Sequence, residues 1–192
     1  MKPQSLLAFV PGLMMVAAFP WLAAAGALPS HATPAPAPQA IEGFINVPVQ
    51  EAWRLFTTPA GYQLAGMGNA EVELRIGGSI RTVYGSQAVP QTVFSEILAY
   101  EPQRMLATRI RQPAADFAYR EASAGPWSVM YFTPSGPDMT QVRIVGLGYN
   151  DTAQSQALRK FLTEGNRTLL DQIAKHYWPK CKLCEKQASE SK

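Results

Sequence analysis

The stretch TAQSQALRKFLTEGNRTLLDQIAKHYW, residues 152–178, decides the fold. Its apolar residues recur at helical spacing and its charged residues fall around the opposite side, which is typical of a long amphipathic helix. Asp151 or Thr152 can cap the N-terminus of this helix, and Pro179 ends it. We predict that the buried stripe consists of Leu158, Leu162, Gly165, Leu169 and Ile173.

The residues before this helix show the alternation of apolar and polar side chains that is expected of β-strands. Strands are predicted over residues 40–47, 72–76, 79–84, 92–100, 105–110, 127–133 and 141–149. The apolar face of such a sheet must be covered, and only the long helix is large enough to cover it. The sequence therefore predicts an α+β domain, in which a curved antiparallel sheet of about six to seven strands wraps around the C-terminal helix.

One short helix is predicted between the first two strands. Pro48 suits the first position of a helix, and Pro59 and Gly61 end it. The apolar residues between them follow at helical spacing: Val49, Ala52, Trp53 and Phe56. Residues 112–126 have no clear period and are predicted to form a long loop.

The N-terminal residues have the pattern of an export signal. Lys2 precedes an apolar run from Leu6 to Leu28, and small residues suited to cleavage follow. We predict a signal peptide over residues 1–27, with an uncleaved membrane anchor as the alternative, because the run is just long enough to span a bilayer. Residues 28–39 are rich in Pro and Ala and are predicted to be a linker. Both alternatives place the domain, residues 40–179, outside the cytoplasm, as a periplasmic or secreted protein.

The charge of the chain does not predict a nucleic-acid partner. The formal net charge is +3, but residues 40–179 contain 12 Lys/Arg and 12 Asp/Glu, so the domain is neutral. The excess comes from Lys2 and from the Lys-rich tail, residues 180–192. Nucleic-acid binding normally requires basic charge clustered on the folded domain. Contact with a membrane is expected only through an uncleaved leader, or weakly through this tail.

Four segments carry a resemblance to a known family: VPVQEAWRLFTTPAGY (47–62), IGGSIR (76–81), EILAYEPQRML (96–106) and TQVRIVGLGY (140–149). In their order and spacing, the chain resembles the START-like (SRPBCC, Bet v 1-like) superfamily, in the branch similar to the C-terminal domain of the Hsp90 ATPase activator. The resemblance implies a helix-grip fold with an apolar cavity between sheet and helix, often used for lipids or other hydrophobic ligands. The chain has Leu64-Ala65 where such proteins usually have an aromatic pair. The leader argues against carrying over a co-chaperone role.

The candidate ligand-binding residues follow from strand alternation together with the family pattern. They should face one another between sheet and helix: Leu98, Tyr100, Met130, Phe132, Ile144, Leu162 and Leu169. Gly146, Gly148 and Gly165 lack side chains on or near these faces. Their absence allows close packing of helix on sheet or leaves a hollow for a ligand, and the sequence leaves both alternatives open.

Glu96 is the candidate polar group of the cavity. If Leu98 and Tyr100 point inward, the period of two places Glu96 on the same face. A carboxyl group there could orient a ligand or act as a base. The alternative, which we favour, is that Glu96 lies at the solvent-facing end of its strand.

The remaining reactive residues predict little chemistry. His176 lies near the end of the long helix and is interpreted as an ordinary helix-end histidine, so no metal site and no cofactor are expected. Cys181 and Cys184 form a C-x-x-C after the C-terminus of that helix, where the helix dipole does not activate a thiol. We predict a local disulfide between them, with a redox or metal role and free thiols as the alternatives.

Three functions are compatible with the sequence. The leading hypothesis is a non-enzymatic, extracytoplasmic binding protein for a hydrophobic small molecule or lipid. The second is an enzyme of the polyketide cyclase/aromatase type, which requires Glu96, Arg109 or Tyr131 to point into the cavity. The third is a module that contacts a protein or a membrane through the tail.

Overall fold

The computed structural model describes residues 38–64, 68–84 and 90–178. The N-terminal part contains strand β1 (Gln39–Ile45), helices α1 (Val49–Thr57) and α2 (Pro59–Leu64), and strands β2 (Ala70–Val72) and β3 (Ser79–Tyr84). Strands β4 (Gln91–Glu101) and β5 (Met105–Gln112) are followed by the 3₁₀ turn η1 (Ala122–Ala124). Strands β6 (Trp127–Gly136) and β7 (Met139–Leu147) and helix α3 (Ala153–Tyr177) complete the fold. The α+β prediction with a C-terminal helix is confirmed.

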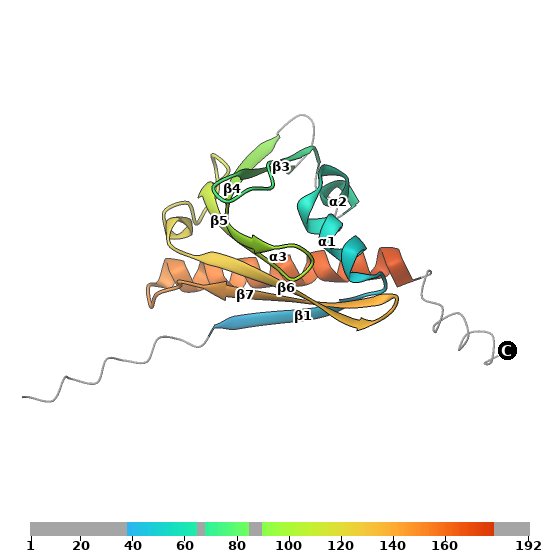
Figure 1. Ribbon diagram of the computed structural model, residues 1–192. Helices are drawn as coiled ribbons and strands as arrows, with labels where there is room; N and C mark the ends of the chain where they lie inside the picture. The colour runs from blue at the N-terminus through green and yellow to red at the C-terminus, as the bar shows by residue number, and fades with distance from the viewer. Residues whose placement is uncertain (1–37, 65–67, 85–89, 179–192) are drawn as a thin grey trace, which may run out of the picture. The chain divides into compact units, whose positions relative to one another are not determined.

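The seven strands form one antiparallel sheet in the order β1-β7-β6-β5-β4-β3-β2. Helix α3 runs along the inner face of this sheet, and α1 and α2 lie toward one end of it (Figure 1). The closest approach of α3 to the sheet is on β1, where Gly43 has no side chain and Leu170 packs directly above its Cα. Helix and sheet are therefore in tight contact along β1, which leaves the side of β3, β4 and β5 less closely covered.

Helix α3 begins and ends where the sequence predicts. The Thr152 hydroxyl accepts a hydrogen bond from the Ser155 backbone N–H at 3.3 Å, which caps the first turn. Leu158 near the N-terminal end and Leu170 and Ile173 toward the C-terminal end are buried. The middle of the predicted stripe is only partly buried, and this part of α3 borders the cavity described below.

The core is densest at the end of the sheet that α1 covers. The Trp53 ring meets the Phe132 ring edge-on with centroids 5.4 Å apart, and the Phe56 ring lies 5.5 Å from Phe132. Tyr100 packs on the other side of Trp53, with ring centroids 6.4 Å apart. This aromatic cluster packs between α1, β4 and β6.

Two elements differ from the sequence-based prediction. The strand predicted over 72–76 ends at Val72, and Leu74 and Ile76 are 37% and 68% exposed. A tight turn causes this, because the Arg75 N–H donates to the Glu73 carbonyl at 2.8 Å. The chain was also predicted to leave helical structure after Pro59, whereas it forms α2. The Thr58 hydroxyl supports this second helix by accepting from the Gly61 N–H at 3.2 Å.

The Gly77-Gly78 pair fixes the turn against the sheet. The Gly77 N–H donates to the Ile97 carbonyl at 2.8 Å, and the Ile97 N–H donates to the Gly78 carbonyl at 2.9 Å. A Cβ at position 78 would collide with the carbonyl oxygen of Glu73. We expect Gly78→Ala to destabilise the fold by about 1–3 kcal/mol, because backbone must move to make room. Urea unfolding of the variant measures this, and a stability equal to the parent protein would contradict the close approach.

The leader, most of the linker, Cys181, Cys184 and the Lys-rich tail lie outside the described residues, so the predictions made for them stay predictions. Of the helices in residues 38–64, 68–84 and 90–178, none is both long and apolar enough to cross a membrane.

Candidate functional site

A cavity lies between the middle of α3 and strands β3, β4 and β5. It has two adjoining parts, which we call the mouth chamber, of about 410 Å³, and the inner chamber, of about 180 Å³. The two chambers share part of their lining: Tyr84, Val93, Ile110, Leu162, Asn166 and Leu169. Together they have a size that suits a small organic molecule.

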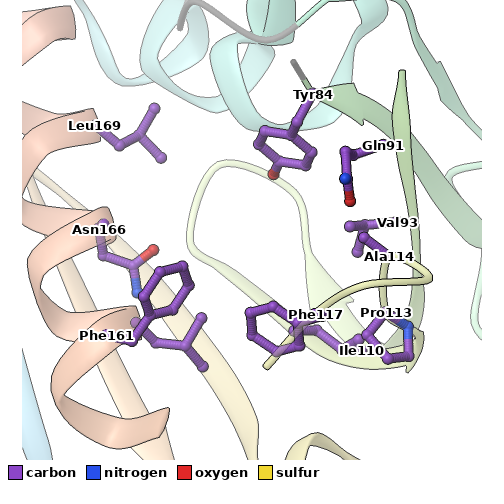
Figure 2. Close-up of a pocket in the computed structure, with 12 residues that line it drawn as sticks. Tyr84, Gln91, Val93, Ile110, Pro113, Ala114, Phe117, Phe161, Asn166 and Leu169 are labelled. Carbon is purple, nitrogen blue, oxygen red and sulfur yellow. The ribbon is translucent and has the colours of Figure 1, made fainter. Parts of the chain in front are cut away.

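The mouth chamber is bounded by α3 on one side and by β4, β5 and the loop after β5 on the other. Figure 2 shows Leu169 and Asn166 of α3 facing Val93 and Ile110 across the hollow, with the Tyr84 ring above it. The wall is almost entirely apolar, since Pro113, Ala114 and Phe117 complete the loop side. Gly165 also lines this chamber, and a Cβ built on it meets nothing within 4 Å. Close packing of helix on sheet, the first of the two roles considered for this glycine, is therefore not observed at this position.

The inner chamber reaches further into the fold, to the buried side chains of Phe56, Ile144 and Leu158. Its lining is mixed, because hydroxyl groups of several strands open onto it next to apolar side chains. The polar members are Tyr62, Tyr84, Ser95, Thr108, Ser123, Ser128, Tyr149 and Asn166. Two of these hydroxyls already bond to the protein: Tyr62 donates to the Phe56 carbonyl at 3.0 Å, and Ser123 donates to the Arg120 carbonyl at 2.7 Å.

The described lining of both chambers contains no charged side chain. Burial raises the pKa of the Tyr149 phenol, with Arg159 opposing the rise, and burial together with Tyr84 raises the pKa of Tyr62 far above its usual range. Both phenols are therefore neutral hydrogen-bonding groups at physiological pH. In the described part of the chain, no group of His, Cys, Asp and Glu residues is arranged to hold a metal ion, and His176 is exposed at the end of α3.

Three aromatic rings close one side of the mouth. Phe117 and Tyr119, from the loop after β5, and Phe161 of α3 contact one another with ring centroids 5.5 to 5.6 Å apart. The Gln91 amide ties the same loop to β4 by donating to the Asp116 carboxylate at 2.6 Å. No role is predicted for this loop from the sequence, and its only signal there is a pair of aromatic residues in an otherwise aperiodic segment.

The comparison with solved structures finds the same architecture in proteins of low sequence identity. A Mesorhizobium loti protein is 16% identical, with a TM-score of 0.57, over 72% of this chain and 95% of that chain. The di-domain ARO/CYC BexL from the BE-7585A biosynthetic pathway is 13% identical, with a TM-score of 0.59, over 74% of this chain and 46% of that chain. The Aha1 dimer from Colwellia psychrerythraea is 12% identical, with a TM-score of 0.51, over 72% of this chain and 96% of that chain. The chain has a START-like, helix-grip fold.

No family model and no curated protein matches the sequence. At these identities the likeness concerns the fold alone, so the chemistry of the cavity must be read from this chain's own residues.

Within the START-like fold, four of the seven predicted ligand-binding residues lie on the cavity walls. Met130 and Ile144 line the inner chamber, and Leu162 and Leu169 line both chambers. Tyr100 and Phe132 belong instead to the aromatic cluster around Trp53. Leu98 lines neither chamber. Ligand binding by the four wall residues stays a prediction.

A β-bulge explains the positions of Leu98 and Glu96. Ile97 pairs with Thr108 and Ala99 with Ala107, so Leu98 is an extra residue without a partner on β5. The alternation assumed from the sequence is broken there, and Ile97 and Tyr100 point inward on either side of the bulge. Glu96, next to the fully buried Ile97, points to the outer face.

The groups that an enzyme of the cyclase type was expected to need do not line either chamber. On the outer face the Glu96 carboxylate accepts from Arg109 Nη2 at 3.0 Å and lies 3.4 Å from Arg111 Nε. Tyr131 is 41% exposed and alternates with the inward-facing Met130 and Phe132. Glu96 therefore lies outside both chambers, in the middle of β4 and not at the end of the strand that was predicted.

We expect Glu96→Gln to have little effect on the protein. A partly exposed ion pair on the outer face contributes less than about 1 kcal/mol, and removal of its charge leaves the cavity unchanged. The measurements are urea unfolding and titration with an apolar fluorescent probe. A change of more than about tenfold in probe affinity would place this carboxyl group at the cavity and contradict the assignment.

Proposed function

We propose that this protein binds an apolar small molecule or lipid in the cavity between α3 and the sheet, outside the cytoplasm, without a chemical step. The observation that carries the proposal is the pair of adjoining chambers lined mostly by apolar side chains, between the middle of α3 and strands β3, β4 and β5. Removal of apolar ligand surface from water would drive binding, at about 25 cal/mol per Å² before the costs of association.

The leader supports the extracytoplasmic part of the proposal. Residues 1–27 have a single positive charge followed by an apolar run, as in secretory signals. Fusion of residues 1–39 to a reporter that is active only after export tests this part by itself, and an inactive reporter would overturn it. The cavity proposal does not depend on the outcome.

The absence of a chemical step is supported by the chamber linings. In the described residues, the walls provide hydroxyl, amide and phenol groups, but no carboxylate, imidazole or guanidinium that could act as an acid or base on a bound molecule. Glu96 and Arg109, the two charged candidates, are paired with each other on the outer face.

The test uses 1,6-diphenylhexatriene, a hydrocarbon that fluoresces strongly in apolar surroundings. We expect saturable binding of about one molecule per chain, at concentrations where the purified protein remains folded. Native mass spectrometry after gentle purification provides the second readout, since a cavity of this kind retains a ligand from the producing cell. No saturable binding of the hydrocarbon, together with an apo mass, would overturn the proposal.

A further inference from the structure

The inner chamber contains a group of hydroxyls on three neighbouring strands: Ser95 of β4, Thr108 of β5 and Ser128 of β6. Thr108 is paired with Ser128 on one side and with Ile97 on the other. Ser95 is two residues before Ile97 and so shares its face. Directly paired side chains have Cβ atoms about 5 Å apart, and diagonal ones about 7–8 Å. One small polar group of a ligand can therefore reach Thr108 and Ser128 together, and Ser95 lies further along the same face.

These three hydroxyls have no hydrogen-bond partner within residues 38–64, 68–84 and 90–178, whereas Ser123 of the same chamber is held by the Arg120 carbonyl. The three hydroxyl oxygens are also not fully buried. Among the described residues, Arg109 Nε is the only side-chain nitrogen or oxygen that is fully buried and lacks a hydrogen-bond partner. The hydroxyls are thus open to the chamber and available to a ligand, and a polar group in an apolar hollow gains from such a partner.

The Asn166 amide of α3 and the Tyr149 phenol lie on the same lining and add two further neutral donors. Among the described residues no charged side chain lines either chamber, and Arg159 acts on the Tyr149 phenol only from outside the lining. Arg159 follows Leu158 on α3, but its Nε donates to the Gln39 side chain at 3.0 Å, and it lines neither chamber. A carboxylate or phosphate carried into the inner chamber would be buried without a counter-charge, which is strongly unfavourable.

We infer that the cavity selects an uncharged amphiphile, whose hydroxyl or carbonyl oxygen enters first and hydrogen-bonds within the group formed by Ser95, Thr108 and Ser128, while its apolar body fills the mouth chamber. The two chambers differ in polarity, and this difference supports the orientation. The hydroxyls of Ser95, Thr108 and Ser128 line the inner chamber, whereas the apolar loop residues Pro113, Ala114 and Phe117 line the mouth chamber. The inference rests on the proposed function and adds the chemical class of the ligand and its direction of insertion.

The experiment compares two ligands of equal chain length, 1-dodecanol and dodecanoate at pH 8, as competitors of bound 1,6-diphenylhexatriene. We expect dodecanol to displace the hydrocarbon at a concentration at least about tenfold lower than dodecanoate, because the carboxylate cannot enter the inner chamber without a counter-charge. Equal potency of the two ligands, or a preference for dodecanoate, would overturn the inference while leaving hydrocarbon binding, and hence the proposed function, intact.

A set of variants tests the three hydroxyls directly. Thr108→Val removes one hydroxyl at constant shape, and combination with Ser95→Ala and Ser128→Ala removes all three. We expect the triple variant to lose about tenfold in dodecanol affinity relative to its affinity for the hydrocarbon, since each hydrogen bond is worth a factor of roughly two to ten. Thr108→Ser, which keeps a hydroxyl, is the matched control and should bind dodecanol like the parent protein. Loss of hydrocarbon and dodecanol binding in equal measure would show that the hydroxyls only support the fold, and would overturn the inference.

Discussion

Gly165→Trp is expected to abolish uptake of 1,6-diphenylhexatriene, with a loss of affinity of at least about tenfold, in a protein that remains folded. Position 165 lies in the middle of α3, lines the mouth chamber and faces open space. An indole at this position would project toward Val93 and Ile110 of the opposite wall and would occupy the volume that the ligand needs. The change does not strain the backbone, because position 165 has ordinary helical geometry and no close neighbour.

Gly165→Ala is the matched control for this prediction. It adds a single methyl group to the mouth chamber, so binding should persist. It should also stabilise the protein by about 0.5–1 kcal/mol, since glycine in the interior of a helix is less favourable than alanine by this amount. Fluorescence titration and guanidinium unfolding measure the two effects on the same samples. Unchanged hydrocarbon binding by Gly165→Trp, with intact helical content, would show that the ligand site lies elsewhere.

The elements best predicted from the sequence are those whose pattern is local. Helix α3 was predicted almost to the residue, because its amphipathic period, the Thr152 cap and Pro179 all lie within the segment itself. The hairpin of β6 and β7 was predicted for the same reason: strand alternation is interrupted by a turn rich in Pro and Gly. These signals also specify the order of the elements, from which the helix-grip fold follows.

The errors arise where pairing between distant strands decides the outcome. The alternation of Leu74 and Ile76 satisfies a strand pattern, but the glycine pair that follows is hydrogen-bonded to β4, and the chain turns instead. The bulge at Leu98 depends on how β4 pairs with β5, and no periodicity within β4 reveals it. Because of this bulge, the β4 residues before Leu98 face the opposite side of the sheet from the one that simple alternation predicts. Ser95 therefore lines the cavity, and Glu96 does not. The polar group of the site was thus predicted one residue away from its position.

The largest expected change in stability concerns β6, where one residue belongs to the packed core and its neighbour on the same face borders the cavity. Phe132 and Met130 are two residues apart on β6 and face the same side of the sheet, and both are predicted from the sequence to bind the ligand. Phe132 is 4% exposed and is enclosed by the Trp53 and Phe56 rings. Phe132→Ala should destabilise the protein by about 3–5 kcal/mol, because it removes a ring from a filled cluster that cannot collapse around the gap. Urea unfolding with a common slope for parent and variant measures this loss.

Met130→Ala provides the comparison, because its side chain borders the inner chamber and has fewer contacts to lose. We expect a loss on the order of 1–2 kcal/mol, together with a change in ligand affinity, since the chamber becomes larger. An equal destabilisation by both substitutions would contradict this division between core and cavity, because it would mean that the inner chamber is as closely packed as the aromatic cluster. A smaller effect at Met130 that is accompanied by altered hydrocarbon binding would instead show that one face of a single strand serves two purposes. On this inner face of β6, Phe132 stabilises the fold by packing against α1, whereas Met130 borders the space that a ligand can enter.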